Sequence, residues 1–180
     1  MVDLDRFEPA RKENYFVAIG RLIPYKKFDL TVQTFNKLGL PLKIIGTGIE
    51  EEKLKKMAKG NIEFLGRIED QKASEIIAKA KALIFPQLED FGITPLEAMA
   101  CGVPVIAYKK GGATETVTTK SGVFFKEQTV KSLEKAIKTF LKKKFSKKEI
   151  KAQAQKFSPS VFDKKIIKFI ENKWEIFNHK

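Results

Sequence analysis

The sequence is poor in cysteine and histidine: each occurs once in 180 residues. Cys101 has no partner for an intrachain disulfide, so a reducing, cytoplasmic setting is the simplest interpretation. With His179 as the single histidine, neither a His/Cys metal site nor a catalytic triad with a histidine base can be built. A metal bound by histidine and cysteine is therefore excluded, and we expect no cofactor.

Long apolar runs are also lacking. None approaches the length that crosses a bilayer, and residues 1–6 are polar and acidic, which is unlike a signal peptide. No G-x-G-x-x-G follows the first apolar run, so a dinucleotide-binding loop is not expected. The length and the 43% of hydrophobic residues suit one domain with a real core and are short for two.

The net charge of +13 is unevenly distributed. Residues 126–180 hold 16 lysines against 6 acidic residues, whereas residues 1–125 are close to balance. A solvated helix surface is the simplest explanation of this segment. The second is contact with an anionic membrane surface, which would place the protein at the periphery of the inner membrane face. Nucleic acid is not expected as a partner, because no nucleic-acid motif accompanies the lysines.

Short apolar runs alternate with amphipathic stretches along most of the chain. The runs predict strands at 15–19, 42–45, 62–65, 82–85, 105–107 and 123–125, and the stretches predict helices at 28–38, 49–58, 70–79 and 94–100. This alternation predicts the α/β class: a Rossmann-like, doubly wound parallel sheet of about six strands, followed by C-terminal helices. In such sheets ligands bind beyond the carboxyl ends of the strands.

Three segments are expected along the chain. Residues 1–13 are predicted to be a linker, residues 14–157 the Rossmann-like domain, and residues 158–180 an amphipathic helix. Apolar residues recur in that helix at spacings of three and four, which predicts packing into the core, with a docking surface for a partner domain as the alternative. They are Phe162, Ile166, Phe169, Ile170, Trp174 and Phe177.

The first candidate motif, Gly20-Arg21-Leu22-Ile23-Pro24-Tyr25-Lys26-Lys27, follows the first predicted strand. A glycine allows a sharp turn, and an arginine and a lysine then lie at the ligand end of the sheet. Arginine offers a planar fork to phosphate oxygens and lysine offers a point charge, so together they suit a diphosphate. Ordinary surface charge is the alternative explanation.

The second motif places Glu89 and Glu97 eight positions apart after the fourth strand. Thr94 is predicted to be a helix N-cap, with Pro95 at the first helical position and Glu97 closing a capping box. Glu97 could therefore serve only as a cap, whereas Glu89 lies in a loop with no helix to cap. The amide groups at a helix start attract phosphate, and two flanking carboxylates could accept hydrogen bonds from a sugar and a ribose.

Two glycine pairs are weaker signals. Gly111-Gly112, after the fifth strand, lets backbone approach a ligand or another strand closely. Gly46-Thr47-Gly48, after the second strand, is equally typical of a plain tight turn.

In this order, the segments resemble the C-terminal domain of glycosyltransferase family four, the group 1 enzymes of GT-B fold, over roughly residues 4–174. The most specific part is the E-x7-E motif from Glu89 to Glu97. The resemblance implies that Arg21 and Lys26 hold the diphosphate leaving group and that Glu89 bonds the transferred sugar. These three are the candidate catalytic residues. It further implies that Glu97 bonds the ribose and that Arg67 and Ile68 lie near the base. The full set of donor-binding residues that it implies is Gly20, Arg67, Ile68, Phe91, Gly92, Ile93, Thr94 and Glu97.

The resemblance also implies an activity. Such enzymes transfer a hexose from a nucleotide-diphosphate sugar with retention of configuration and without a divalent metal, because two cationic side chains replace it. Many members have glycine after the motif lysine, where this chain has Lys27. In this departure the chain resembles a subgroup with a second basic residue at that position, which includes many mannosyl- and other sugar transferases of surface-polysaccharide assembly. This favours GDP-mannose as the donor and a glycan or a lipid-linked molecule as the acceptor.

The full family enzyme has an N-terminal acceptor domain, for which 180 residues leave no room. We therefore expect a fragment that binds the nucleotide sugar but transfers little sugar alone. Two other functions remain open at this point: a nucleotide-sugar epimerase-type domain of the same fold, and a non-catalytic nucleotide-binding or interaction module.

Overall fold

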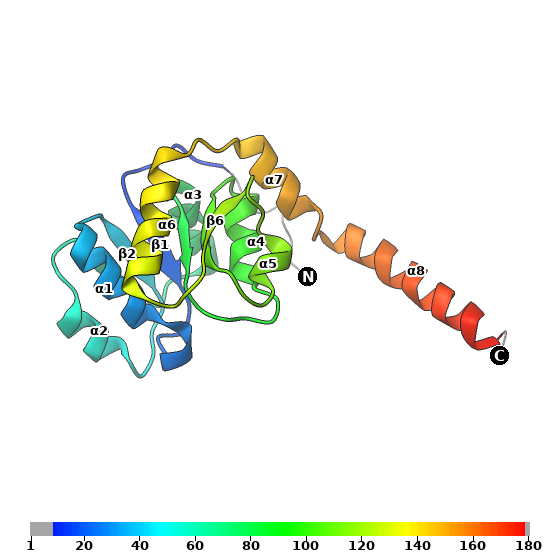
Figure 1. The fold of residues 1–180 in the computed structure, drawn as a ribbon, viewed down its shortest axis with the longest axis horizontal. Coiled ribbons are helices and arrows are strands. Elements are labelled where there is room, and N and C mark those ends of the chain that lie inside the picture. The colour runs from blue at the N-terminus through cyan, green and yellow to red at the C-terminus, as the bar shows by residue number, and fades with distance from the viewer. Residues whose placement is uncertain (1–8, 179–180) are drawn as a thin grey trace.

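A six-stranded parallel sheet forms the centre of the computed structural model, which describes residues 9–178 (Figure 1). The strand order is β3-β2-β1-β4-β5-β6, so the chain winds outward in both directions from β1 and β4. The doubly wound sheet predicted from the sequence is thus confirmed. Its strands are β1 (Phe16–Ile19), β2 (Leu42–Ile45), β3 (Ile62–Gly66), β4 (Leu83–Phe85), β5 (Val105–Tyr108) and β6 (Gly122–Phe125).

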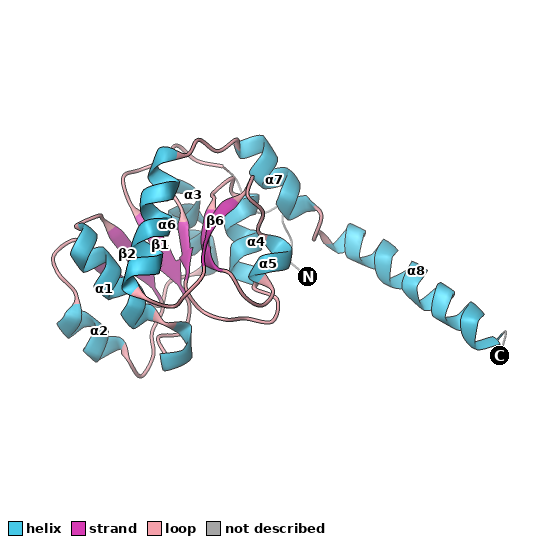
Figure 2. Cartoon of the chain, in the orientation of Figure 1, coloured by secondary structure: helices cyan, strands magenta, loops and turns pink. Residues whose placement is uncertain are grey.

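Helices connect the strands and continue beyond the last one (Figure 2). A short 3₁₀ helix, η1 (Pro24–Lys26), precedes the first of them. The α-helices are α1 (Phe28–Leu38), α2 (Glu51–Met57), α3 (Asp70–Lys79), α4 (Ile93–Ala100), α5 (Ala113–Thr116), α6 (Val130–Lys142), α7 (Lys147–Gln155) and α8 (Pro159–Asn178). Residues 1–8 of the predicted linker, and His179, lie outside the described residues.

The core has two parts, one on each face of the sheet. Alternate residues of β1 point to opposite faces, so Phe16 packs with α1 and α6 on one face, and Val17 packs with α3, α4 and α7 on the other. Phe16 makes edge contacts with the rings of Phe35 and Phe140 at 5.3 and 5.8 Å between centroids. Both faces are therefore covered, which explains why most strand residues are apolar, with Lys43 in β2 and Glu63 in β3 as the charged exceptions.

Helix α3 begins at Asp70, as the sequence predicts, whereas α4 begins at Ile93, one residue before the predicted start. The N-cap of α4 is Gly92, which has a φ of 81° and where a Cβ would lie 3.3 Å from the ring of Phe85. This left-handed glycine turns the loop directly into the helix, so Thr94 lies inside the first turn. The predicted N-cap at Thr94 and its capping box are wrong.

Helix α8 projects away from the rest of the molecule (Figure 1). None of its residues is buried, and its apolar side chains are exposed, including Trp174 at 63% and Phe177 at 70%. The predicted packing of this stripe into the core is therefore wrong. Periodicity shows that one face of a helix is apolar, but it carries no information about what covers that face. Across residues 9–178, no helix is both long and apolar enough to span a membrane.

Candidate donor-binding site

The loops after β1 and β4 are neighbours, because the sheet reverses its winding between these two strands. Lys26, in the 3₁₀ turn after β1, donates from Nζ to Oε1 of Glu89 in the loop after β4. The two side chains are largely buried, at 16% and 25% exposed. Two predicted site residues that are 63 positions apart in the sequence thus form one ion pair at the ligand end of the sheet.

The loop that carries Arg21 is held by its backbone. Gly20 follows β1 at once and donates its amide to the carbonyl of Ile45, and the buried Leu22 donates its amide to Thr47 at 2.9 Å. Arg21 itself is exposed and makes no ion pair with any residue in the described range. Its guanidinium is therefore on the surface near the start of the loop that ends in Lys26.

The Gly46-Thr47-Gly48 turn has a structural requirement for glycine. A Cβ on Gly46 would lie 2.0 Å from the carbonyl oxygen of Gly20, and one on Gly48 would lie 2.4 Å from that of Leu22. Larger residues at either position would push the two loops apart. The turn after β2, which was the weakest candidate in the sequence, therefore packs against the loop that holds Arg21 and Lys26 and supports it.

Gly111 and Gly112 pack directly under the segment that carries Glu89. The amide of Gly112 donates to the carbonyl of Glu89 at 2.8 Å. A Cβ on Gly112 would lie 2.3 Å from the carbonyl oxygen of Asp90, and one on Gly111 would lie 2.3 Å from that of Glu89. The close approach expected from the paired glycines is therefore to another loop of the protein, and it positions Glu89.

The start of α4 lies beside this segment. Because Gly92 is the N-cap, the amides of Gly92, Ile93 and Thr94 have no partner within the helix, and Pro95 has no amide hydrogen. These amides and the helix dipole create a positive end that suits a phosphate. Glu97 is half-buried in the second turn of α4 and also takes part in contacts of its own.

A shallow depression of about 450 Å³ opens between the loops that carry Lys26 and Glu89, although neither of these two side chains lines it. Its lining includes three residues that the sequence did not single out: Tyr25, Leu88 and Gln128. Gln128 follows β6 and donates from Nε2 to the carbonyl of Pro86 at 2.8 Å, which ties the loop after β6 to the loop after β4. Its place directly after a predicted strand is the signal that could have identified it.

Arg67 and Ile68 are at the same edge of the sheet but farther from the ion pair. They follow β3, which is separated from β4 by β2 and β1, or by roughly 14 Å at the usual spacing of strands. Arg67 is exposed, and Ile68 is partly buried against the core. Phe91 and Ile93 are exposed at 43% and 49%. Residues 9–178 contain no cluster of three or more side chains that could hold a metal ion.

Lys27 is the one non-glycine residue with a positive φ, at 57°, among the described residues. A left-handed conformation costs an L-residue about 1–2 kcal/mol in the folded state. Glycine removes this cost, but it loses more backbone entropy on folding, which cancels part of the gain. We expect Lys27→Gly to raise the free energy of unfolding by about 0.5–1 kcal/mol. Urea denaturation measures this change, with Lys56→Gly, in the exposed face of α2, as the contrasting variant that should lose stability. If both variants had a lower free energy of unfolding than the parent, the left-handed conformation of Lys27 would not be a source of strain.

Comparison with known proteins agrees with this architecture. Residues 3–157 match the family model described as glycosyl transferases group 1. The chain is 32% identical, over 163 residues, to the GDP-mannose-dependent monoacylated alpha-(1-6)-phosphatidylinositol monomannoside mannosyltransferase of Corynebacterium glutamicum. That match covers 73% of this chain and 43% of the relative, so the chain spans less than half the length of this relative.

Solved structures show the same fold. The sucrose-phosphate synthase of Thermosynechococcus elongatus superposes with a TM-score of 0.78 over 99% of this chain and 52% of its own, at 20% identity. Anabaena HepE in complex with UDP and glucose superposes with a TM-score of 0.70 over 87% of this chain and 54% of its own, at 18% identity. Because the matched residues span most of the sequence, the chain belongs to the group 1 glycosyltransferases.

Proposed function

We propose that the crevice between the β1 and β4 loops binds the diphosphate of GDP-mannose, and that the chain is the donor-binding part of a retaining mannosyltransferase. The observation that carries this proposal is the Lys26–Glu89 ion pair beside the start of α4. It brings a cation, a carboxylate and free helix amides together at the switch point of the sheet, which is where α/β folds bind their ligands.

The positive groups would act on the leaving diphosphate. When the bond between the sugar and the diphosphate breaks, negative charge builds on the terminal phosphate oxygens. The ammonium of Lys26 has three hydrogens, so it can keep its bond to Glu89 and still donate to a phosphate. The exposed guanidinium of Arg21 and the amides of Ile93 and Thr94 add donors that strengthen as this charge develops.

The acidic groups would hold the sugar and the ribose. Lys26 occupies Oε1 of Glu89, which leaves Oε2 as an acceptor for a sugar hydroxyl. Glu97 would accept hydrogen bonds from the ribose one turn into α4, with Gly92 allowing the backbone to approach the ligand. Gly20 and Phe91 would contact the donor from the two sides of the crevice, and Arg67 and Ile68 would meet the base.

GDP-mannose is the donor best supported. The corynebacterial relative is GDP-mannose-dependent by its name, and the resemblance of the segment around Lys27 to a subgroup that includes mannosyltransferases favours the same donor. We propose that no divalent metal takes part, because Arg21 and Lys26 supply two positive charges at the diphosphate. The acceptor would be a glycan or a lipid-linked molecule.

We further propose that the chain functions with an acceptor-binding domain as part of a longer enzyme. The relatives' greater length supports this, and so does the exposed apolar stripe of α8, which offers a surface for that domain to cover. In this arrangement the 180-residue chain would bind the donor but transfer sugar at a small fraction of the full enzyme's rate.

A thermal-shift panel tests the proposed donor. We expect GDP and GDP-mannose, at about one hundred times their dissociation constants, to stabilise the chain by roughly 2.7 kcal/mol. UDP, ADP and their glucose conjugates at the same concentration serve as matched ligands, and we expect smaller shifts from them. Equal increases in melting temperature with the guanine, uracil and adenine nucleotides would contradict the preference for GDP-mannose. No increase with any of them would contradict the donor site itself.

A further inference from the structure

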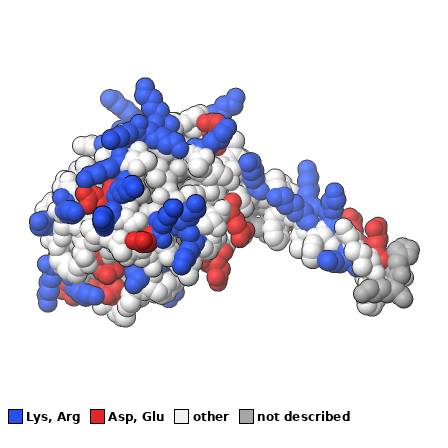
Figure 3. Space-filling model, viewed as in Figure 1, with Lys and Arg blue, Asp and Glu red and all other residues white. Residues whose placement is uncertain are grey.

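A row of lysines lies outside the donor site, on the exposed face of α6 and in the segment that leads into α7. Along the upper edge of the view in Figure 3, basic side chains gather where α6 passes into α7. We call this surface the lysine ridge. Its members are all exposed: Lys131, Lys135, Lys138, Lys142, Lys144 and Lys148.

The spacing of the lysines in α6 places them on one side of the helix. They follow one another at intervals of four, three and four residues, which is the repeat of a single helical face about 16 Å long. The opposite face is buried through Leu133, Ile137 and Phe140. The four lysines of α6 therefore lie in a straight row along a helix whose position is fixed by its packing on the sheet.

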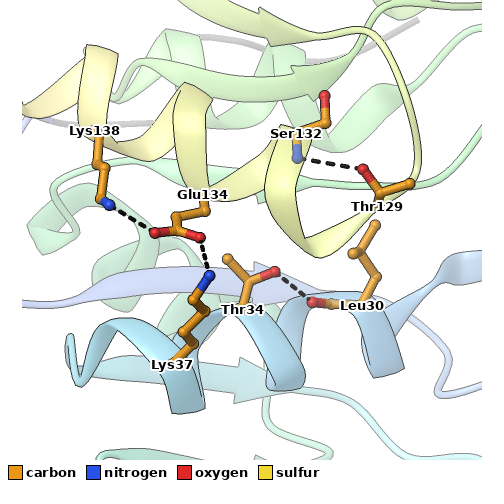
Figure 4. Close-up of polar contacts among 7 residues, drawn as sticks. All are labelled: Leu30, Thr34, Lys37, Thr129, Ser132, Glu134 and Lys138. Carbon is orange, nitrogen blue, oxygen red and sulfur yellow. Dashed lines mark hydrogen bonds and ion pairs between the residues drawn. The ribbon is translucent and has the colours of Figure 1, made fainter.

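Little negative charge offsets the ridge. Glu134 is its main acidic neighbour and accepts hydrogen bonds at 2.6 Å from both Lys138 and, in α1, Lys37 (Figure 4). These bonds, first from Lys138 and then from Lys37, lower the pKa of Glu134 to about 2, so one carboxylate is shared by two lysines. Within the described residues, the structure shows no ion pair for Lys131, Lys135 or Lys142.

The form of the ridge favours an extended anionic surface over a small ligand or a nucleic acid. The depression beside α6 is lined by Lys37 and four ridge lysines, but it is shallow and open, with a volume of about 610 Å³. Single-stranded nucleic acid is bound by aromatic platforms interleaved with cations. Here Phe140 is buried and Phe145 is half-buried under Lys143, so no exposed ring accompanies the lysines of α6 and the adjoining turn.

The ridge begins next to the donor site. Helix α6 follows β6, whose carboxyl end lies at the ligand edge of the sheet, and Gln128 links this connection to the loop of Glu89. Lys131 is therefore close to that edge, and Lys142 is at the far end of the helix. A membrane lying along the ridge would run beside the crevice, where a lipid-linked acceptor would have to arrive.

We infer that the lysine ridge docks this chain on a membrane rich in anionic lipid. Lysines within a Debye length of a negatively charged bilayer each add attraction, and the ridge presents several that no carboxylate neutralises. The inference rests on the proposed function in one respect, which is that a lipid-linked acceptor must reach the crevice.

Sedimentation of the full chain with lipid vesicles tests the ridge. We expect binding to vesicles of phosphatidylcholine mixed with phosphatidylglycerol, a loss of binding as NaCl rises, and no binding to phosphatidylcholine alone. The triple variant Lys131→Gln, Lys135→Gln, Lys142→Gln should lower the partition coefficient by about 100-fold, because each lysine contributes about fivefold. The matched control Lys56→Gln, Lys59→Gln, Lys72→Gln removes the same charge from exposed sites outside the ridge and should change it only a few-fold.

Three results would overturn the inference. The first is an equal loss in the ridge variant and the control, which would make net charge the cause. The second is salt-independent binding to phosphatidylcholine alone, which would assign membrane contact to the apolar stripe of α8. The third is tighter binding to a mixed-sequence RNA than to anionic vesicles at the same salt. The GDP-induced thermal shift of the ridge variant should equal that of the parent, so a failure of the ridge and a failure of the donor site remain distinguishable.

Discussion

Replacing Lys26 by alanine is expected to weaken the binding of GDP-mannose by about 100-fold, since a charge-assisted hydrogen bond contributes about 1.5–3 kcal/mol. The change removes the bond to the diphosphate and leaves Glu89 without its partner beside the same phosphates. An unneutralised carboxylate there would repel the ligand. Both effects act in the same direction, so Lys26→Ala should have a larger effect than Arg21→Ala, which removes an exposed group alone.

Isothermal titration with GDP-mannose measures this change. Lys56→Ala is the matched control, because it removes one exposed lysine from α2 at a distance from the crevice and should leave affinity within about twofold. Circular dichroism should show that Lys26→Ala stays folded, since the ion pair joins two loops and belongs to neither hydrophobic core cluster. Unchanged affinity in a folded Lys26→Ala variant would show that the ion pair is only structural.

Replacing Gly112 by valine is expected to cause a large loss of stability. The first carbon of the new side chain would lie 2.3 Å from the carbonyl oxygen of Asp90 and 2.6 Å from Cα of Phe91, and backbone atoms cannot move aside cheaply. Overpacking of this kind costs about 1–3 kcal/mol, so the melting temperature should fall by about 5–10 °C. Donor binding should also be lost, because the clash displaces the segment between Glu89 and Phe91.

Gly60 offers a control for that experiment. No atom lies within 4 Å of a Cβ at this position, and its φ lies outside the left-handed region, so Gly60→Ala should leave both stability and donor binding nearly unchanged. Differential scanning calorimetry and a GDP titration on the two variants measure both properties. A Gly112→Val variant that melts with the parent and still binds GDP would mean that the loop around Asp90 is free to move.

The strands were predictable because their apolar runs are short and each ends at glycine, proline or a charged loop. Phe28–Leu38 and Leu42–Ile45 match the predicted ranges, and the class of the fold follows from the alternation alone. The start of α4 was not predictable in the same way. A Thr-Pro-x-Glu run is typical of a helix start at Thr94, whereas the φ of 81° that makes Gly92 the N-cap is a property of the folded loop, in which a Cβ at this position would meet the ring of Phe85 at 3.3 Å.

The same limit applies to the site. Each motif could be read locally, but strand order decides which loops meet, and the pairing of Lys26 with Glu89 follows from β1 and β4 being neighbours. The contact of Gly112 with the loop at Glu89 and Asp90 could not be predicted either. A pair of glycines indicates that another group packs closely, but it does not indicate which group. The wrong placement of the α8 stripe has a related cause, because amphipathic periodicity is the same for a face that meets the core and for one that meets another domain.

A crystal structure of the chain with GDP-mannose would test the central claim most directly. We expect the diphosphate within hydrogen-bond distance of Lys26 Nζ and of the Thr94 amide, with a sugar hydroxyl on Glu89. A diphosphate bound elsewhere on the protein, such as on the lysines of α6, with the Lys26–Glu89 pair facing empty solvent, would contradict it.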